Sequence, residues 1–262
     1  MNARGNGANQ RAGGARLRLG KMARIRIVTL LGAWLAWEAL ARSGLVFQGV
    51  VPSSLTVLGS AAEQLADPAF YGHLWRSAYE ILSGFTIGTL SGIAIGLAMG
   101  LSNFLGRMLH PWLNVLAPTP KIIFLPVLMI LFGVEIGSKI AIAAFSAFFP
   151  VMIATFDGAL QVPPVLVQVA RSFKAGRWEL MSKVYLPAML PAVVTGMRLG
   201  LGVAIIGTLL AEIKLSNRGL GFLAIQQYEA FHIPDLYAVL LITFVLAVFA
   251  NGLIGRLAAR LR

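Results

Sequence analysis

Residues 81–106 read ILSGFTIGTLSGIAIGLAMGLSNFLG and contain no charged side chain. A helix needs about 20 consecutive, mostly apolar residues to cross the hydrocarbon core of a bilayer. This stretch exceeds that length. Residues 236–255 are equally free of charge. Both stretches therefore predict transmembrane helices.

The composition of the whole chain agrees with these two stretches. Of its 262 residues, 58% are hydrophobic and only 12% are charged, and the mean hydropathy is +0.79. Soluble domains contain about 25% charged residues. The composition excludes a soluble domain, and no polar block is long enough to fold separately.

The sequence offers no catalytic or metal-binding pattern. It contains no cysteine, which excludes a disulfide framework, a thiolate metal site and a cysteine nucleophile. Its three histidines, His73, His110 and His232, are far apart in the chain. We therefore expect no metal site and no catalytic residue.

Apolar segments recur along most of the chain. Pro118, Pro120 and Pro126 interrupt one of them, which predicts a broken helix there. The segments predict an all-α polytopic membrane protein with about six transmembrane helices, forming one domain over residues 25–262 after a basic tail at 1–24. A short helix over 52–67 and a polar connector over 213–235 join segments on the outer side. The six segments are about 25–42, 80–101, 111–133, 138–157, 187–212 and 236–255.

The distribution of basic residues predicts the orientation. The chain has 22 Lys and Arg against 10 Asp and Glu, a formal charge of +12. Basic residues gather in the tail, in the 102–110 and 158–186 loops and at the C-terminal end. Such an excess marks cytoplasmic segments. We therefore expect both termini in the cytoplasm and contact of the tail with membrane lipid, and we expect no nucleic-acid partner.

A stripe of glycines follows the second segment. In lipid, small residues let two helix backbones approach closely, and this is the main packing device available there. We expect the stripe to pack against another helix, the alternative being that it lines a pathway. Its members are Gly84, Gly88, Gly92, Gly96 and Gly100.

The loop over residues 158–186 carries two amphipathic patterns. After Pro163 and Pro164, one helical face holds Val165, Leu166, Val169, Ala170 and Phe173. Gly176 permits a break, and a second short helix precedes Leu186-Pro187, which is expected to open the fifth segment. Two such helices either lie on the membrane surface or dock into the groove of a soluble partner.

The same loop resembles a known signature. Residues 167–190, VQVARSFKAGRWELMSKVYLPAML, resemble the cytoplasmic loop of ATP-binding-cassette (ABC) importer permeases: E-A-A, three residues, G, nine residues, I, one residue, L-P. Gln168 stands at the E position and Lys174 at the G position, so a bend that needs positive φ would be strained at Lys174, unless Gly176 takes it over. Further stretches are similar to the sulfonate, taurine and nitrate branch of that family: 118–133, 149–150, 196–202, 211–212 and 219–221.

The resemblance implies partners and a location. The loop would insert into an ATPase subunit, two of which would bind ATP and magnesium, since this chain lacks a phosphate-binding loop and would not itself be an enzyme. A second permease copy, as a homodimer or with a related permease, and a periplasmic or surface-anchored binding protein would complete a multi-pass importer in a bacterial inner membrane. The resemblance implies ATPase-coupling roles for Val165, Gln168, Val169, Ala170, Arg171, Phe173, Lys174, Gly176, Leu186 and Pro187.

Four charged residues within or near the segments are candidates for the pathway: Lys121, Arg198, Glu212 and Glu38. A cation deep in a bilayer costs about 2.5 to 3.5 kcal/mol on insertion scales, so it usually faces protein or water. Lys121 and Arg198 either satisfy polar groups of the bundle or attract an anionic substrate. A neutral heterocyclic nutrient stays open as an alternative substrate. An ion-coupled carrier stays open as an alternative mechanism, although such carriers often contain an internal repeat and none is visible here.

Overall fold

The computed structural model describes residues 7–44 and 50–260, in two units, Met1–Ser60 and Ala61–Arg262. Within the described residues every regular element is a helix and there is no strand. This confirms the predicted all-α fold.

The first unit contains α1 (Gly7–Arg42) and the beginning of α2 (Ser54–Ala66). Glu38 Oε2 accepts hydrogen bonds from the Ser54 backbone N–H at 3.1 Å and from the Ser54 hydroxyl at 2.8 Å. The first N–H groups of a helix have no partner within the helix. Glu38 therefore caps α2, and its other oxygen pairs with Arg42 at 2.7 Å.

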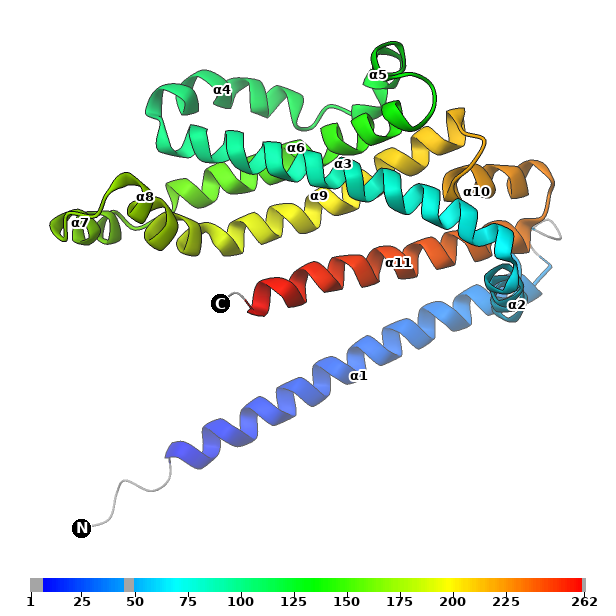
Figure 1. Ribbon diagram of the computed structural model, residues 1–262. Coiled ribbons are helices and arrows are strands. Elements are labelled where there is room, and N and C mark those ends of the chain that lie inside the picture. Colours follow the sequence, from blue (N-terminus) through cyan, green and yellow to red (C-terminus); the bar gives the residue numbers. More distant parts are fainter. Residues whose placement is uncertain (1–6, 45–49, 261–262) are drawn as a thin grey trace. The chain divides into compact units, whose positions relative to one another are not determined.

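The second unit holds the long helices. In Figure 1, α3, α6, α9 and α11 run alongside one another, with the α3–α4 turn, α7 and α8 at one end and α10 at the opposite end. The elements are α3 (Pro68–Leu101), α4 (Asn103–Leu116), η1 (Lys121–Phe124), α5 (Leu125–Phe132), α6 (Ile136–Leu160), α7 (Pro164–Ser172), α8 (Arg177–Leu180), η2 (Met181–Tyr185), α9 (Leu186–Leu215), α10 (Leu220–Glu229) and α11 (Ile233–Arg260).

Four helices of the described chain are long and apolar enough to cross a membrane: Pro68–Leu101, Ile136–Leu160, Arg177–Leu215 and Ile233–Arg256. The segment predicted at 111–133 is divided, because α4 ends at Leu116 and the next helical residues begin at Lys121. This confirms the expected break. Since α1 is not among the four, the count of six spans and the cytoplasmic placement of both termini stay predictions.

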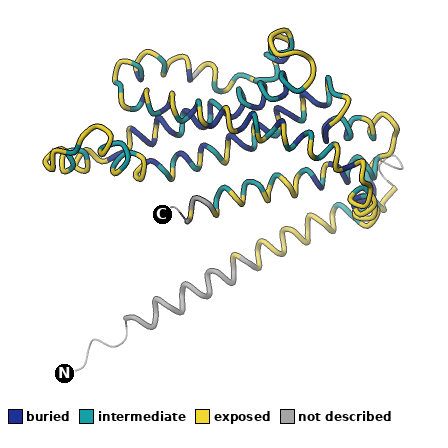
Figure 2. The backbone as a smooth tube through the Cα atoms, in the orientation of Figure 1, coloured by how far each residue is buried: buried dark blue, intermediate teal, exposed yellow. Residues whose placement is uncertain are grey.

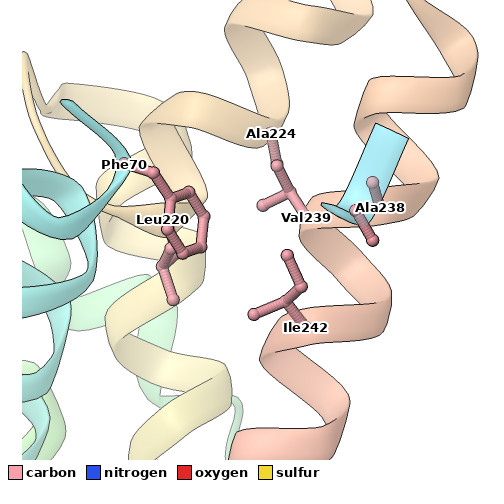
Figure 3. Packing of buried hydrophobic residues seen from close by; sticks show 7 residues of the cluster. Phe70, Leu220, Ala224, Ala238, Val239 and Ile242 are labelled. Carbon is pink, nitrogen blue, oxygen red and sulfur yellow. The ribbon is translucent and has the colours of Figure 1, made fainter. Parts of the chain in front are cut away.

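The core of the second unit lies between α3, α6 and α9, where buried residues are concentrated (Figure 2). The sequence predicted a polar connector over 213–235. The structure instead has a helix there, α10. The first turn of α10 is buried, since Leu220 and Ala224 pack on α11 rather than facing water. The labelled residues of this cluster in Figure 3 are Phe70, Leu220, Ala224, Ala238, Val239 and Ile242.

Candidate functional site

The loop that joins α6 to α9 lies at one end of the long helices (Figure 1). It presents exposed apolar side chains there. The exposed fractions are 63% for Val165, 49% for Val169 and 83% for Phe173. Leu166 is also exposed, and Ala170 is half-buried. Apolar side chains gathered on a protruding helix form the type of surface that another protein or a membrane covers.

The end of α7 forms a tight reversal at Lys174. The Ala175 N–H donates to the Ala170 carbonyl at 3.1 Å, and the Lys174 N–H donates to the Arg171 carbonyl at 2.9 Å. This is the hydrogen-bond pattern of a helix end with a left-handed residue, a place that glycine usually takes. Here Lys174 takes it, with φ 55.

Of the two positions that the sequence left open for this bend, Lys174 takes it and Gly176 does not. Gly176 has φ −69 and ψ 168, an extended conformation open to any residue. Its N–H donates to Glu179 Oε2 at 3.1 Å. Gly176 therefore begins α8, and the backbone strain lies two residues earlier, at Lys174.

Leu186-Pro187 does not open a separate helix. The chain is continuously helical from Arg177 to Leu215, and Met181–Tyr185 forms a wide π-helical turn directly before Pro187. Proline lacks an N–H and its ring crowds the preceding turn. A wide turn relieves that crowding without breaking the helix. The second helix of the loop is therefore an extension of α9.

The glycine stripe of α3 lies against α6. A Cβ added at Gly92 would stand 2.9 Å from the Phe148 carbonyl oxygen, and one at Gly88 would stand 3.0 Å from Ala147 Cβ and closer still to the Ala144 carbonyl. Any larger side chain at these positions would have to push the two backbones apart. The structure places Gly84, Gly88, Gly92, Gly96 and Gly100 at this interface.

Lys121 lies at the break between α4 and η1. Its ammonium donates to the carbonyls of Leu116, Ala117 and Thr119 at 2.9, 2.6 and 2.7 Å. An ammonium has three protons, so these three carbonyls occupy all of them. A cavity of about 310 Å³ lies beside it and is lined by the 117–122 segment together with α6 and α9 residues such as Ser146 and Gly207.

The other three candidate charges lie apart from Lys121. Arg198 Nε donates to Asn251 Oδ1 at 2.8 Å, which ties α9 to α11. Glu212 is buried in contact with α3 and α10, and Glu38 caps α2 in the first unit. Among the described residues, no hydrogen bond or ion pair joins any two of the four, so they do not form one site.

A buried polar group beside Glu212 was missed in the sequence. Glu80 and Lys139 are 0% and 1% exposed, and Arg76 Nε donates to Glu80 Oε1 at 2.7 Å. The i, i+4 spacing of Arg76 and Glu80 on one helix was a usable signal. Lys139 offered no such signal, because it lies on α6, far along the chain from Arg76 and Glu80 on α3.

Comparison with known proteins identifies the family. Residues 88–262 match the family described as binding-protein-dependent transport system inner membrane component. The chain is 32% identical to the putative aliphatic sulfonates transport permease protein SsuC of Bacillus subtilis, over 86% of this chain and 82% of that protein. It is 34% identical to the taurine transport system permease protein TauC of Escherichia coli, over 67% and 63%.

A solved structure shares the fold. A chain of the inward-facing MetNI methionine ABC transporter matches with a TM-score of 0.63 and 20% identity, over 75% of this chain and 99% of that one. Permeases of this family work with an ATPase and a substrate-binding protein. The chain therefore belongs to the family of binding-protein-dependent transport system inner membrane components, as a multi-pass permease subunit of an ABC importer in a bacterial inner membrane.

Proposed function

We propose that this permease imports a small solute that carries an anionic group, of the sulfonate or taurine type, using ATP hydrolysed on two ATPase subunits that dock on α7. Those subunits bind ATP and magnesium, while this chain binds no cofactor and has no enzymatic activity of its own. A second copy of the chain completes the pathway as a homodimer, and a periplasmic or surface-anchored protein delivers the anion. The observation that carries the proposal is the exposed apolar face of α7.

The shape and chemistry of α7 favour docking into a protein groove. An amphipathic helix binds a groove through apolar residues one turn apart, and Val165, Val169 and Phe173 have that spacing and are exposed. The reversal at Lys174 turns the chain directly into the continuous helix that becomes α9. Movement of a docked ATPase would therefore displace α9 as a rigid body.

The substrate class rests on two supports. The relatives SsuC and TauC are named for aliphatic sulfonates and taurine. In this chain, the cavity beside Lys121 contains one positive charge and no acidic residue in its lining. In a low-dielectric setting such a charge raises the local potential. Because its protons are engaged by carbonyls, Lys121 acts on the anion through its field and not as a direct ligand.

The experiment is ATPase stimulation in the reconstituted complex with its binding protein. Taurine and an alkanesulfonate should each accelerate ATP hydrolysis, and a neutral heterocycle of similar size should not. Stimulation by the neutral compound alone would contradict the anion assignment while leaving the permease role intact. Loss of all stimulation in a complex whose binding protein demonstrably binds the tested anion would contradict the coupling itself.

A further inference from the structure

A serine hydroxyl on α6 lies beside the Lys121 cavity without a protein partner. Ser146 is 4% exposed, and it lines the cavity that Lys121 also lines. Among the described residues, its hydroxyl has no hydrogen-bond partner. A buried polar group without a partner costs free energy. A solute in the cavity would supply the missing acceptor.

Other hydroxyls in the long helices are satisfied locally. A serine or threonine within a helix can donate to the backbone carbonyl one turn earlier. Thr89 and Thr208 also lack a partner among the described residues, but neither lines this cavity. Ser146 therefore differs from both groups, because its hydroxyl is uncommitted and borders open space. Five hydroxyls of the described long helices donate one turn back: Thr86, Ser91, Thr155, Thr195 and Thr243.

Gly207 on α9 keeps the Ser146 hydroxyl uncovered. A Cβ added at Gly207 would stand 2.8 Å from Ser146 Oγ, and the next nearest atoms would be 3.6 Å away. A side chain at this position would therefore crowd the hydroxyl and little else. Gly207 lines the same cavity, so the missing side chain leaves the hydroxyl open to a solute there.

The charge of the cavity favours an anion as that solute. Lys121 lines the cavity and no acidic residue does. The three protons of its ammonium are donated to backbone carbonyls, so Lys121 attracts an anion without bonding to it. The Ser146 hydroxyl is a donor that is still available. A hydrogen bond from a hydroxyl to an anionic oxygen is stronger than one between two neutral groups.

The α9 wall of the cavity suits an alkyl chain. Val203, Ile206 and Leu210 line it from one face of α9, because they are three and four residues apart. The volume of about 310 Å³ lies at the lower end of the range for small-molecule sites, about 300–1,000 Å³. A small solute with an anionic head and a short alkyl tail matches both the polar and the apolar part of this wall.

We propose that Ser146 is a direct ligand of the substrate within the membrane. Its hydroxyl donates a hydrogen bond to an oxygen of the anionic head group, and the α9 wall contacts the alkyl tail. Lys121 contributes its field, and Gly207 leaves the hydroxyl accessible. This subsite rests on the proposed function, since it takes the same class of solute, and it adds the side chain that binds the solute directly.

Thermal unfolding of the assembled complex of permease and ATPase, titrated with propane-1-sulfonate, measures this contact. A ligand that binds only the folded protein raises the unfolding temperature, so propane-1-sulfonate should do so in wild type. Ser146→Ala should weaken the apparent affinity about tenfold or more, the loss expected for one hydrogen bond to a charged group. Methyl propyl sulfone, a neutral compound of similar size, should bind wild type more weakly than the sulfonate does.

Three further variants separate binding from packing. Gly207→Ala should also weaken the affinity for propane-1-sulfonate, because its methyl group crowds the Ser146 hydroxyl. Gly202→Ala, on the same helix with nothing within 4 Å of the added Cβ, should leave the affinity unchanged. Ser91→Ala should leave it unchanged as well, since Ser91 bonds to its own helix. Without ligand, Ser146→Ala should unfold at the wild-type temperature, because its hydroxyl has no protein partner to lose.

The outcomes distinguish the subsite from the proposed function. Equal affinity of wild type and Ser146→Ala for propane-1-sulfonate would overturn the role of Ser146 and leave the anionic substrate standing. Equal or tighter binding of the neutral sulfone to wild type would contradict the anionic substrate, and with it the proposed function. Absence of any stabilisation of wild type by propane-1-sulfonate would overturn the subsite.

Discussion

The carboxylate of Glu212 on α9 accepts a hydrogen bond of 2.6 Å from the hydroxyl of Ser77 on α3. The same hydroxyl accepts the first backbone N–H of α10, from Leu220. Both side chains are fully buried. One serine thus joins three helices at the end of the bundle opposite α7, and a typical hydrogen bond of this kind contributes about 0.5–1.5 kcal/mol.

Removing that hydroxyl should destabilise the permease. Ser77→Ala leaves the Leu220 N–H and one Glu212 oxygen without partners in the interior, and we expect a loss of about 2 kcal/mol or more, measured by thermal unfolding in detergent. Ser91→Ala is the matched control, because Ser91 bonds only to carbonyls of its own helix. Equal unfolding temperatures for the two variants would contradict the role of Ser77.

The close approach of α3 to α6 predicts opposite effects of two glycine substitutions. Gly88→Ala would drive a methyl group into the Ala144 carbonyl and should cost about 1–3 kcal/mol through overpacking. Gly202→Ala, in α9, meets nothing within 4 Å and should gain about 0.5–1 kcal/mol from better helix propensity. The check is the sign of each change in unfolding temperature. A stabilised Gly88→Ala would mean that the helices are farther apart than described.

The left-handed backbone at Lys174 predicts that glycine is better there. Lys174→Gly should relieve about 1 kcal/mol of backbone strain and slow hydrogen exchange of the Lys174 and Ala175 amides. Gly176→Ala is the control, since its φ of −69 suits any residue and nothing lies within 4 Å of an added Cβ. Faster hydrogen exchange of these amides in Lys174→Gly would show that backbone strain at Lys174 does not destabilise the end of α7.

The three carbonyls held by Lys121 predict a structural cost when the ammonium is removed. Lys121→Met should lower stability by about 1 kcal/mol, because the carbonyls of Leu116, Ala117 and Thr119, at most partly buried, lose their donor. It should also lower anion uptake per folded protein, while Lys121→Arg keeps the charge and retains more uptake. Arg198→Met is the comparison, and we expect a smaller loss of stability there, since the side chain of Arg198 bonds to Asn251 and not to three carbonyls. Unchanged stability in Lys121→Met would contradict the bonding described.

Much of the architecture could be predicted because bilayer physics acts on local sequence. Uncharged runs specify membrane helices, and Pro118 and Pro120 specify the break before η1. A glycine every four residues predicts a close helix–helix contact but does not identify the second helix. The structure shows that this helix is α6. The amphipathic pattern at 164–173 also predicted α7, because helical periodicity is read from neighbouring residues.

The buried polar group could not be predicted from local pattern. Ser77 and Glu212 are far apart in the chain, and no periodicity of the sequence predicts their contact. α10 was hidden for a related reason: it has only ten residues, and the burial of its apolar side chains comes from α3 and α11. The strain lies at Lys174 and not at Gly176 because Lys174 is the residue that follows the helix end. The sequence defines such helix boundaries only to within one or two residues.

Uptake into proteoliposomes that contain the permease, its ATPase and its binding protein tests the central claim most directly. Taurine or an alkanesulfonate should accumulate only when ATP is supplied on the α7 side. Ala170→Arg, which places a charge on the apolar face of α7, should abolish accumulation and co-purification of the ATPase while the permease stays in the membrane. Gln161→Arg, which adds a cation just outside α7, should leave both intact. Full uptake by Ala170→Arg, or accumulation without ATP, would contradict an importer driven through α7.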